Sequence, residues 1–217
     1  MARLNIAVLI SGRGSNLQAL IDGCATPDFP AQIGLVISNT PDAAGLERAR
    51  KAGFAAEIVN HRDHAGREGF EAALDKSLTR AGIELICLAG FMRLLTPGFV
   101  DRWADRLINI HPSLLPAYKG LDTHARVLAD GVRFTGCTVH FVRAEMDHGP
   151  VILQAAVPVH CDDDEASLAA RVLAAEHRCY PRALRLIADG RVEITDEIVT
   201  IKGMQSPDAV LVNPQPD

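Results

Sequence analysis

Residues 4–21 read LNIAVLISGRGSNLQALI, and this stretch decides the fold. It begins with a nearly continuous apolar run, Leu4–Ile10, as expected of a strand that is buried on both faces of a sheet. A glycine loop, Ser11–Ser15, follows, and a helix is predicted from about Asn16 to Gly23. A buried strand that turns through glycines into a helix is typical of the first unit of a doubly wound α/β fold.

The same alternation of apolar runs and helical patterns continues to about residue 90. It predicts the strands Ile33–Ile37, Ala56–Asn60 and Ile83–Gly90, and the helices Pro41–Ala52 and Gly66–Arg80. Strand–helix units in succession predict a parallel sheet with right-handed crossovers. The N-terminal half is therefore expected to be Rossmann-like.

The second half of the chain has a different pattern. An extended segment is predicted at Arg106–His111 and a short helix at Thr123–Asp130, and Cys137–Val142 and Val151–Val159 read as an antiparallel strand pair. After this pair, Asp162 with Glu165 resembles a capping box.

The capping box predicts a long helix to about Ala188, with a kink at Pro181. A final strand is predicted at Arg191–Thr195. The fold class is thus α/β, a single doubly wound, mostly parallel sheet with an antiparallel pair and a long helix at its C-terminal end. One domain is expected over 1–195 and a partly disordered tail over 196–217.

Composition excludes several classes of function. The 217 residues carry a net charge of −5 and contain no run of Lys and Arg, so neither nucleic acid nor an acidic membrane surface is an expected partner. The first apolar run is too short for a secretion signal or a membrane span, which favours a cytoplasmic protein. None of the five cysteines forms a CxxC pair, so neither a disulfide framework nor a metal site is indicated.

The glycine loop suits a phosphate. Backbone N–H groups at the start of a helix point outward and carry partial positive charge. A dinucleotide is disfavoured, because Leu17 stands where the fingerprint needs a third glycine and the second strand ends in Ser38-Asn39 without an acid for a ribose. A tight turn without a ligand remains the alternative.

Asn109 and His111 carry the strongest sign of chemistry. They are two residues apart in an extended segment, so their side chains share a face, and Pro112 keeps His111 out of the helical region. An amide donor beside an imidazole can stabilise a developing oxyanion. Asp147, in the loop between the two late strands, would favour the imidazolium form if it reached His111. A buried structural histidine and a plain Asp-x-Gly-Pro turn are the alternatives.

Four motifs in order resemble those of the phosphoribosylglycinamide formyltransferases, folate-dependent enzymes of de novo purine synthesis. They are VLISGRGSNLQALI (8–21), LAGFMRLLTP (88–97), NIHPSLLPAYKG (109–120), and GCTVHFV (136–142) with Asp147-x-Gly-Pro after it. The resemblance extends from about residue 4 to residue 195. It implies the formyltransferase fold and the transfer of a formyl group from 10-formyltetrahydrofolate to the amine of glycinamide ribonucleotide.

The resemblance also implies roles for particular residues. Asn109, His111 and Asp147 match the catalytic trio of the family. The substrate phosphate would be held by Gly14, Ser15 and Asn16, and Glu176 matches a residue on the substrate's amine side. The residues that match folate-binding positions are Arg67, Met92, Arg93, Leu94, Leu95, Asn109, Arg143, Ala144, Glu145 and Met146.

No metal is expected, and the protein is expected to be a monomer or a homodimer. Two residues depart from the family's pattern. Ala144 stands where an acidic residue is common in the loop that wraps the pterin, and His148 follows Asp147 where a smaller residue is usual.

Three other functions remain open at this point. A formyltetrahydrofolate deformylase would use the same trio with water as the acceptor, although that family usually carries an additional N-terminal module. A formyltransferase acting on initiator tRNA usually has a basic C-terminal domain. A non-catalytic folate- or nucleotide-binding protein would need none of Asn109, His111 and Asp147.

Overall fold

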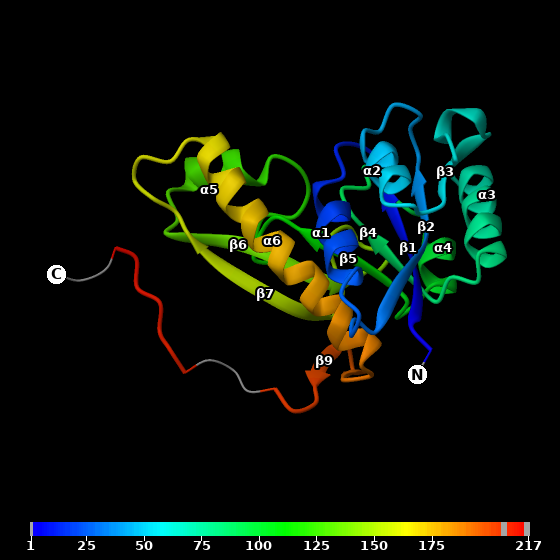
Figure 1. Ribbon diagram of the computed structural model, residues 1–217. Coiled ribbons are helices and arrows are strands. Elements are labelled where there is room, and N and C mark those ends of the chain that lie inside the picture. Colours follow the sequence, from blue (N-terminus) through cyan, green and yellow to red (C-terminus); the bar gives the residue numbers. More distant parts are fainter. Residues whose placement is uncertain (1, 205–207, 215–217) are drawn as a thin grey trace.

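A seven-stranded sheet in the order β3-β2-β1-β4-β5-β6-β7 forms the centre of the molecule (Figure 1). The computed structural model describes residues 2–204 and 208–214. Strands β1 to β5 are parallel to one another, β6 is antiparallel to β5, and β7 is antiparallel to β6. The strands are β1 (Leu4–Ile10), β2 (Ala31–Ser38), β3 (Ala56–Ile58), β4 (Leu85–Leu88), β5 (Leu107–His111), β6 (Phe134–Phe141) and β7 (Val151–Pro158). The predicted α/β fold class is confirmed.

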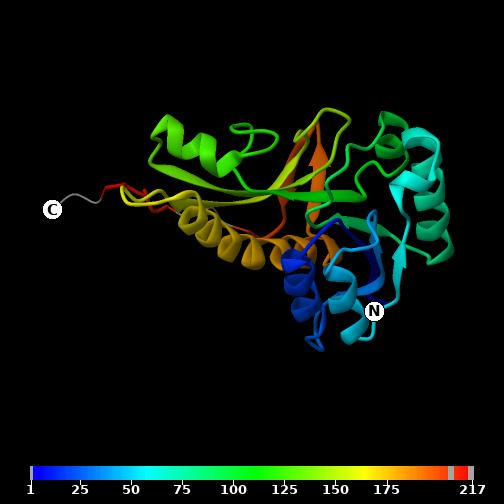
Figure 2. The same cartoon turned by 90° about the horizontal axis from the view of Figure 1, so that it is seen from above.

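Helices cover both faces of this sheet, as Figure 2 shows. On one face lie α1 (Ser15–Cys24), α2 (Gly45–Lys51) and α6 (Glu165–Ala188), and on the other α3 (Gly66–Arg80) and α4 (Pro97–Arg102). Helix α5 (Thr123–Asp130) and the short 3-10 helix η1 (His61–Asp63) complete the helical elements of the described chain.

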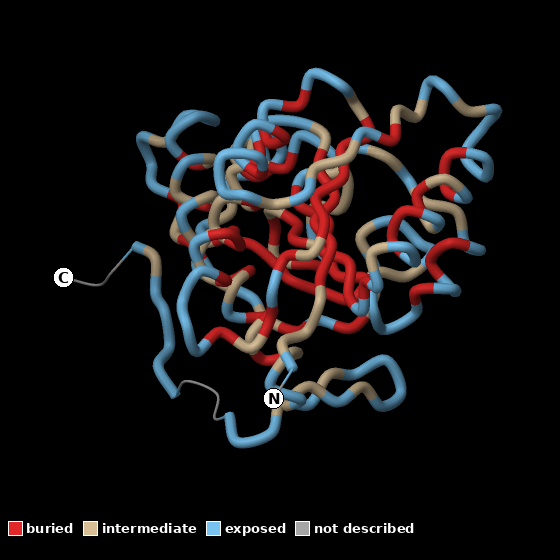
Figure 3. Tube along the Cα trace, turned by 45° about the vertical axis from the view of Figure 1, so that its right-hand side comes forward, coloured by how far each residue is buried: buried red, intermediate tan, exposed pale blue. Residues whose placement is uncertain are grey.

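The apolar run of β1 is explained by these two layers. Ile6, Val8 and Ile10 belong to the core cluster on the side of α1 and α6. The alternate residues Ala7 and Leu9 belong to the cluster that contains the apolar face of α3. Every second side chain thus enters a different core, so the run cannot alternate with polar residues. The central strands are accordingly the most buried part of the trace (Figure 3).

The strand order places a crevice beside β1. From β1 the chain moves outward to β2 and β3, and then crosses to β4 on the other side of β1. The loops that leave the carboxyl ends of β1 and β4 therefore diverge to opposite faces and leave a crevice between them, where ligands bind in open α/β sheets.

Several boundaries differ from those expected. Helix α2 begins at Gly45 rather than at Pro41, because the Gly45 N–H donates to the Gly12 carbonyl outside the helix. Helix α6 begins at Glu165, and its capping box joins Asp164 and Ser167 rather than Asp162 and Glu165. The helix continues through Pro181 to Ala188. Helix α4, η1 and a last strand were not expected.

That last strand is β9 (Ile198–Ile201), which forms an antiparallel hairpin with β8 (Val192–Thr195). It lies within the segment 196–217 that was expected to be a tail. Residues 205–207 and 215–217 of that segment lie outside the described residues. Within 2–204 and 208–214, no helix is long and apolar enough to cross a membrane.

Candidate active site

The glycine loop is held from behind by α2. The Gly45 N–H donates to the Gly12 carbonyl at 3.0 Å, and Arg48 Nε donates to the Arg13 carbonyl at 2.9 Å. With these carbonyls turned toward α2, the loop has a fixed conformation. The first helical hydrogen bond of α1 runs from Gln18 to Gly14, so the N–H groups of Ser15 and Asn16 have no intrahelical acceptor.

Gly14 must be glycine for two reasons. Its φ of 72° lies in the left-handed region, and a Cβ built on it would lie 2.7 Å from the Gly45 Cα. A side chain at residue 14 would therefore push the loop away from α2.

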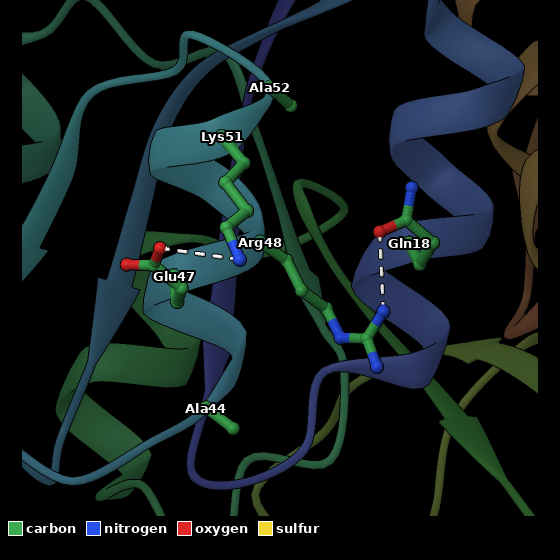
Figure 4. A pocket seen from close by; sticks show the side chains of 6 residues that line it. All are labelled: Gln18, Ala44, Glu47, Arg48, Lys51 and Ala52. Atoms are coloured by element: carbon green, nitrogen blue, oxygen red, sulfur yellow. Dashed lines mark hydrogen bonds and ion pairs between the residues drawn. The ribbon is translucent and has the colours of Figure 1, made fainter.

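Two hollows adjoin this loop. The larger, about 610 Å³, lies between α1 and α2 behind the loop (Figure 4). Its charged groups already have partners, because Lys51 Nζ lies 3.5 Å from Glu47 Oε1, and Arg48 Nη1 donates to Gln18 Oε1 at 3.4 Å. The smaller, about 310 Å³, is the crevice between the loops after β1 and β4. Its lining is Ser11, Gly12, Arg13, Gly14, Ser15, Asn16, Ala89, Gly90 and Met92.

Hydrogen bonds join the two sides of the crevice. Ser11 Oγ donates to Asn39 Oδ1 at 2.6 Å and accepts from the Met92 N–H at 2.7 Å. The segment after β4 is thereby fixed against the glycine loop. The two motifs at 8–21 and 88–97 consequently form one site.

His111 and Asp147 are brought together at the end of β5. His111 Nδ1 lies 3.4 Å from Asp147 Oδ1, and His111 Nε2 donates to the Tyr118 carbonyl at 2.9 Å. The other oxygen of Asp147, Oδ2, accepts from the Gly120 N–H at 2.7 Å. Both ring nitrogens of His111 thus face acceptors, an arrangement that the doubly protonated imidazolium satisfies. The His111 side chain is 7% exposed, so water screens this pair weakly.

Asn109 is oriented by His140 on the neighbouring strand. The two residues are direct partners in the β5–β6 register, and Asn109 Nδ2 lies 3.4 Å from His140 Nε2. With His140 Nδ1–H donating to the Phe141 carbonyl at 2.9 Å, Nε2 is left as the acceptor. Burial lowers the pKa of His140, which supports this neutral form. The pairing of His140 with Asn109 depends on the register of β5 and β6, which no local pattern in the sequence gives.

Glu176 is buried beside the glycine loop. Its Oε2 accepts from Asn16 Nδ2 at 2.7 Å, and the residue is 6% exposed. Burial raises the pKa of its carboxyl, and the hydrogen bond from Asn16 opposes that shift. Asn16 Oδ1 is buried and has no hydrogen-bond partner among the described residues. Helix α6 thus brings a carboxyl group to the phosphate-type loop.

Exposed apolar side chains come from three segments that border the site. Met92, Leu94 and Met146 are exposed, as is Leu121, which the sequence analysis did not single out. Arg93 lies over the Phe70 ring at 5.6 Å, and Arg67 is exposed on the first turn of α3. Leu95 is half-buried against the second core cluster, and Ala144 is exposed.

Arg143 and Glu145 do not present free charges to the site. Arg143 donates to Glu197 and Asp105, and Glu145 Oε1 accepts from Lys119 Nζ at 2.7 Å. The guanidinium of Arg143 is turned toward the β8–β9 hairpin, and the match of Arg143 to a folate-binding position stays a prediction. No group of three or more His, Cys, Asp or Glu side chains suited to a metal occurs within the described ranges.

Comparisons with known proteins agree with this geometry. Residues 4–184 match the family described as Formyl transferase. The Escherichia coli phosphoribosylglycinamide formyltransferase is 46% identical over 94% of this chain and 96% of its own length. The human trifunctional purine biosynthetic protein adenosine-3 is 49% identical over 88% of this chain, which spans only 19% of that protein.

Solved structures of formyltransferases are similar to this chain as well. Glycinamide ribonucleotide transformylase 1 from Symbiobacterium toebii has a TM-score of 0.89 and 49% identity, with 92% of this chain and 94% of that chain covered. A formyltetrahydrofolate deformylase from Burkholderia mallei has a TM-score of 0.84 but only 27% identity, with 92% of this chain and 70% of that chain covered.

Proposed function

The chain belongs to the formyl transferase family, and within it to the phosphoribosylglycinamide formyltransferases; from this premise we propose its reaction and the roles of its residues. It transfers the formyl group of 10-formyltetrahydrofolate to the amine of glycinamide ribonucleotide, in de novo purine biosynthesis. The observation that carries this proposal is the cluster of Asn109, His111 and Asp147 at the end of β5, beside a crevice lined by a phosphate-type loop.

The reaction needs stabilisation of one oxyanion and the movement of one proton. The amine attacks the formyl carbon, and the carbonyl oxygen gains negative charge in a tetrahedral intermediate. Asn109 Nδ2–H is one donor for that oxygen, and His111 Nε2–H becomes the other by exchanging the Tyr118 carbonyl for the oxyanion. The proton lost by the amine reaches folate N10 as the bond from N10 to the formyl carbon breaks, and Asp147 maintains the charge of His111 throughout.

The acceptor substrate is bound through the start of α1. The backbone N–H groups of Ser15 and Asn16, with Gly14 shaping the turn, receive the phosphate. An overall charge of −5 is compatible with this anion, because the attraction comes from helix-end N–H groups rather than from a basic surface. Glu176 accepts hydrogen bonds on the amine side of the same substrate.

The formyl donor is bound on the other side of His111. The exposed apolar side chains of Met92, Leu94 and Met146 offer a surface for the pterin, while the backbone of 92–95 and of 143–146 offers polar groups for its edge. Leu95 completes that stretch, and Ala144 and Glu145 contribute through their main chains. Arg67 and Arg93 supply positive charge for the acidic end of the folate.

A deformylase is the second candidate, because its trio is the same and a deformylase structure shares the fold. The closer agreement in sequence and length with the transferases favours the amine as the acceptor. We further propose that the enzyme works in the cytoplasm on these two small molecules, as a monomer or homodimer, without nucleic acid, a membrane or a metal.

One assay tests the proposed function against its rivals. The protein is incubated with 10-formyltetrahydrofolate, with and without glycinamide ribonucleotide, and tetrahydrofolate and formylated product are followed. We expect both products to form together and only when the amine is present. Tetrahydrofolate release without the amine would identify a hydrolase, and no release under either condition would identify a binding protein.

Glu176→Gln is expected to change the pH dependence of the free energy of unfolding, and separately to weaken substrate binding. Burial raises the folded-state pKa of Glu176 above the unfolded value, so the folded state is favoured at low pH and loses stability as pH rises from the unfolded pKa toward the folded one. Glutamine accepts the same hydrogen bond from Asn16 without ionising. The free energy of unfolding of the variant, relative to wild type, should therefore increase in denaturant titrations as pH rises above the unfolded-state pKa of glutamate.

The same change should weaken substrate binding. Loss of a charge-assisted hydrogen bond is worth roughly 1.5–3 kcal/mol, so KM for glycinamide ribonucleotide should rise about tenfold or more. Glu165→Gln, at an exposed position on the same helix, is the control and should show neither effect. A pH-independent stability difference together with an unchanged KM would contradict both the burial argument and the binding role.

A further inference from the structure

We propose that Glu197, in the turn of the β8–β9 hairpin, is a positioning residue for the formyl-transfer site, acting through Arg143 on the loop that carries Asp147. This inference rests on the proposed function, because it concerns the same reaction. It gives a role to a segment that the sequence analysis had placed outside the catalytic domain.

Hydrogen bonds to two carboxylates occupy most of the N–H groups of the Arg143 guanidinium. Nε donates to Glu197 Oε2 at 2.7 Å, and Nη2 donates to Glu197 Oε1 at 3.0 Å, a two-point fork across 54 residues of sequence. Nη2 also donates to Asp105 Oδ1 at 2.8 Å, just before β5. Planar two-point pairs of this kind fix direction as well as distance. The Arg143 side chain is 21% exposed, so it is better shielded than either partner.

The main chain of Arg143 closes the loop that contains Asp147. Its N–H donates to the His148 carbonyl at 3.0 Å, while the Phe141 N–H donates to the Pro150 carbonyl at 2.9 Å. The Arg143 side chain also lies against Gly149, where a built Cβ would approach its Cγ at 3.1 Å. A shift of the guanidinium would therefore move the base of a loop whose tip contacts His111.

The residues that hold Arg143 lie in turns with unusual backbone geometry. Glu197 has a φ of 62°, its neighbour Asp196 has a φ of 50°, and Asp105 has a φ of 57°. Positive φ at both central positions of a two-residue hairpin matches the twist of the strands, but it is costly for residues other than glycine, asparagine or aspartate. Asp147 itself has a φ of 47°. The pair therefore joins two turns with positive φ, one of which carries a proposed catalytic group, and Glu197 is the residue among them for which this conformation is costly.

The test compares Glu197→Gln with Glu193→Gln. Glu193 belongs to the same hairpin and pairs with Lys202 Nζ at 2.8 Å, and among the described residues it has no hydrogen bond or ion pair with the Asp147 loop, so it controls for loss of a hairpin ion pair. We expect Glu197→Gln to lower kcat/KM for the formyl donor by about three- to tenfold, with KM for glycinamide ribonucleotide and the Tm unchanged. The ratio of wild-type to variant activity should shrink toward one at high salt, because screening weakens the wild-type pair.

Hydrogen exchange supplies a readout that needs no activity. The amides of 142–150 should exchange faster in Glu197→Gln than in wild type, and at the wild-type rate in Glu193→Gln. Arg143→Lys, which cannot form the fork, should behave like Glu197→Gln and serves as the second variant if that one does not fold. Faster exchange in a protein that lacks transferase activity would support the positioning role of the Glu197–Arg143 pair and would overturn the proposed function. Exchange of 142–150 at the wild-type rate in Glu197→Gln would overturn the positioning role of the Glu197–Arg143 pair. Equal effects of Glu197→Gln and Glu193→Gln on kcat/KM for the formyl donor would overturn it as well.

Discussion

Replacement of His111 by alanine is expected to lower kcat by about 10²–10³-fold while the protein remains folded. Removal of one donor to an oxyanion typically costs about 2.7–4 kcal/mol of transition-state stabilisation. His111 is buried at the end of β5, and its Nε2–H, which donates to the Tyr118 carbonyl at 2.9 Å in this structure, would exchange that partner for the reacting oxygen. Asp147 would keep its hydrogen bond from the Gly120 N–H at 2.7 Å, so its loop retains one anchor.

The measurement is steady-state turnover with both substrates saturating, together with thermal unfolding. Asn109→Ala should lose activity to a similar degree, and the double variant should lose much less than the product of the two effects, since both donors serve one oxygen. His160→Ala removes an exposed imidazole beyond β7 and is the control. A His111→Ala enzyme within a few-fold of wild type would remove His111 from the mechanism.

Asp147→Asn is expected to lower kcat by about 10²–10⁴-fold, the range typical of a lost acid–base group. Asparagine has the shape of aspartate but only one acceptor oxygen. Asp147 now faces the His111 ring with Oδ1 and accepts from the Gly120 N–H with Oδ2. The amide can accept from the Gly120 N–H with its oxygen and turn its N–H₂ toward His111 Nδ1, which accepts that hydrogen bond only when the ring is neutral.

Comparison of Asp147→Asn with Asp147→Ala tests whether charge or shape matters. If the carboxylate keeps His111 charged, both variants should be impaired to within about tenfold of each other. An asparagine variant that retains most activity would show that Asp147 only positions His111 and Gly120, and would exclude its electrostatic role. Both enzymes should unfold within a few degrees of wild type, because the loop keeps its main-chain pair between Arg143 and His148.

Most of the parallel half of the fold could be predicted from the sequence. The apolar run of β1 and the helix α3, predicted at its observed bounds, depend on local periodicity and on glycine at particular turns. Helix α2 was predicted to begin four residues too early. Its true start is set by the hydrogen bond from the Gly45 N–H to the carbonyl of Gly12, which lies in a loop distant in sequence. Strand β9 was missed because its turn, Asp196-Glu197, lacks the glycine that usually marks a two-residue hairpin.

The candidate site was predictable in part. Asn109 and His111 were expected to share a face, and in the structure they lie at neighbouring same-face positions of β5. The pairing of Asn109 with His140 was not predictable, since it depends on the antiparallel register of β5 and β6. The orientation of Arg143 was not predictable, because the acidic partners that take its guanidinium lie 38 and 54 residues away.

Local sequence patterns were enough to predict the strand–glycine loop–helix unit, the parallel sheet around it, and the residue types available for catalysis. These follow from interactions between residues close together in the chain, which chirality and side-chain period control. Only the tertiary structure decided which of those residues meet. Asn16 contacts Glu176 across 160 residues, and Gly120 anchors Asp147 across 27. Such contacts depend on strand order and on the path of α6, and neither can be predicted from a local pattern of residues.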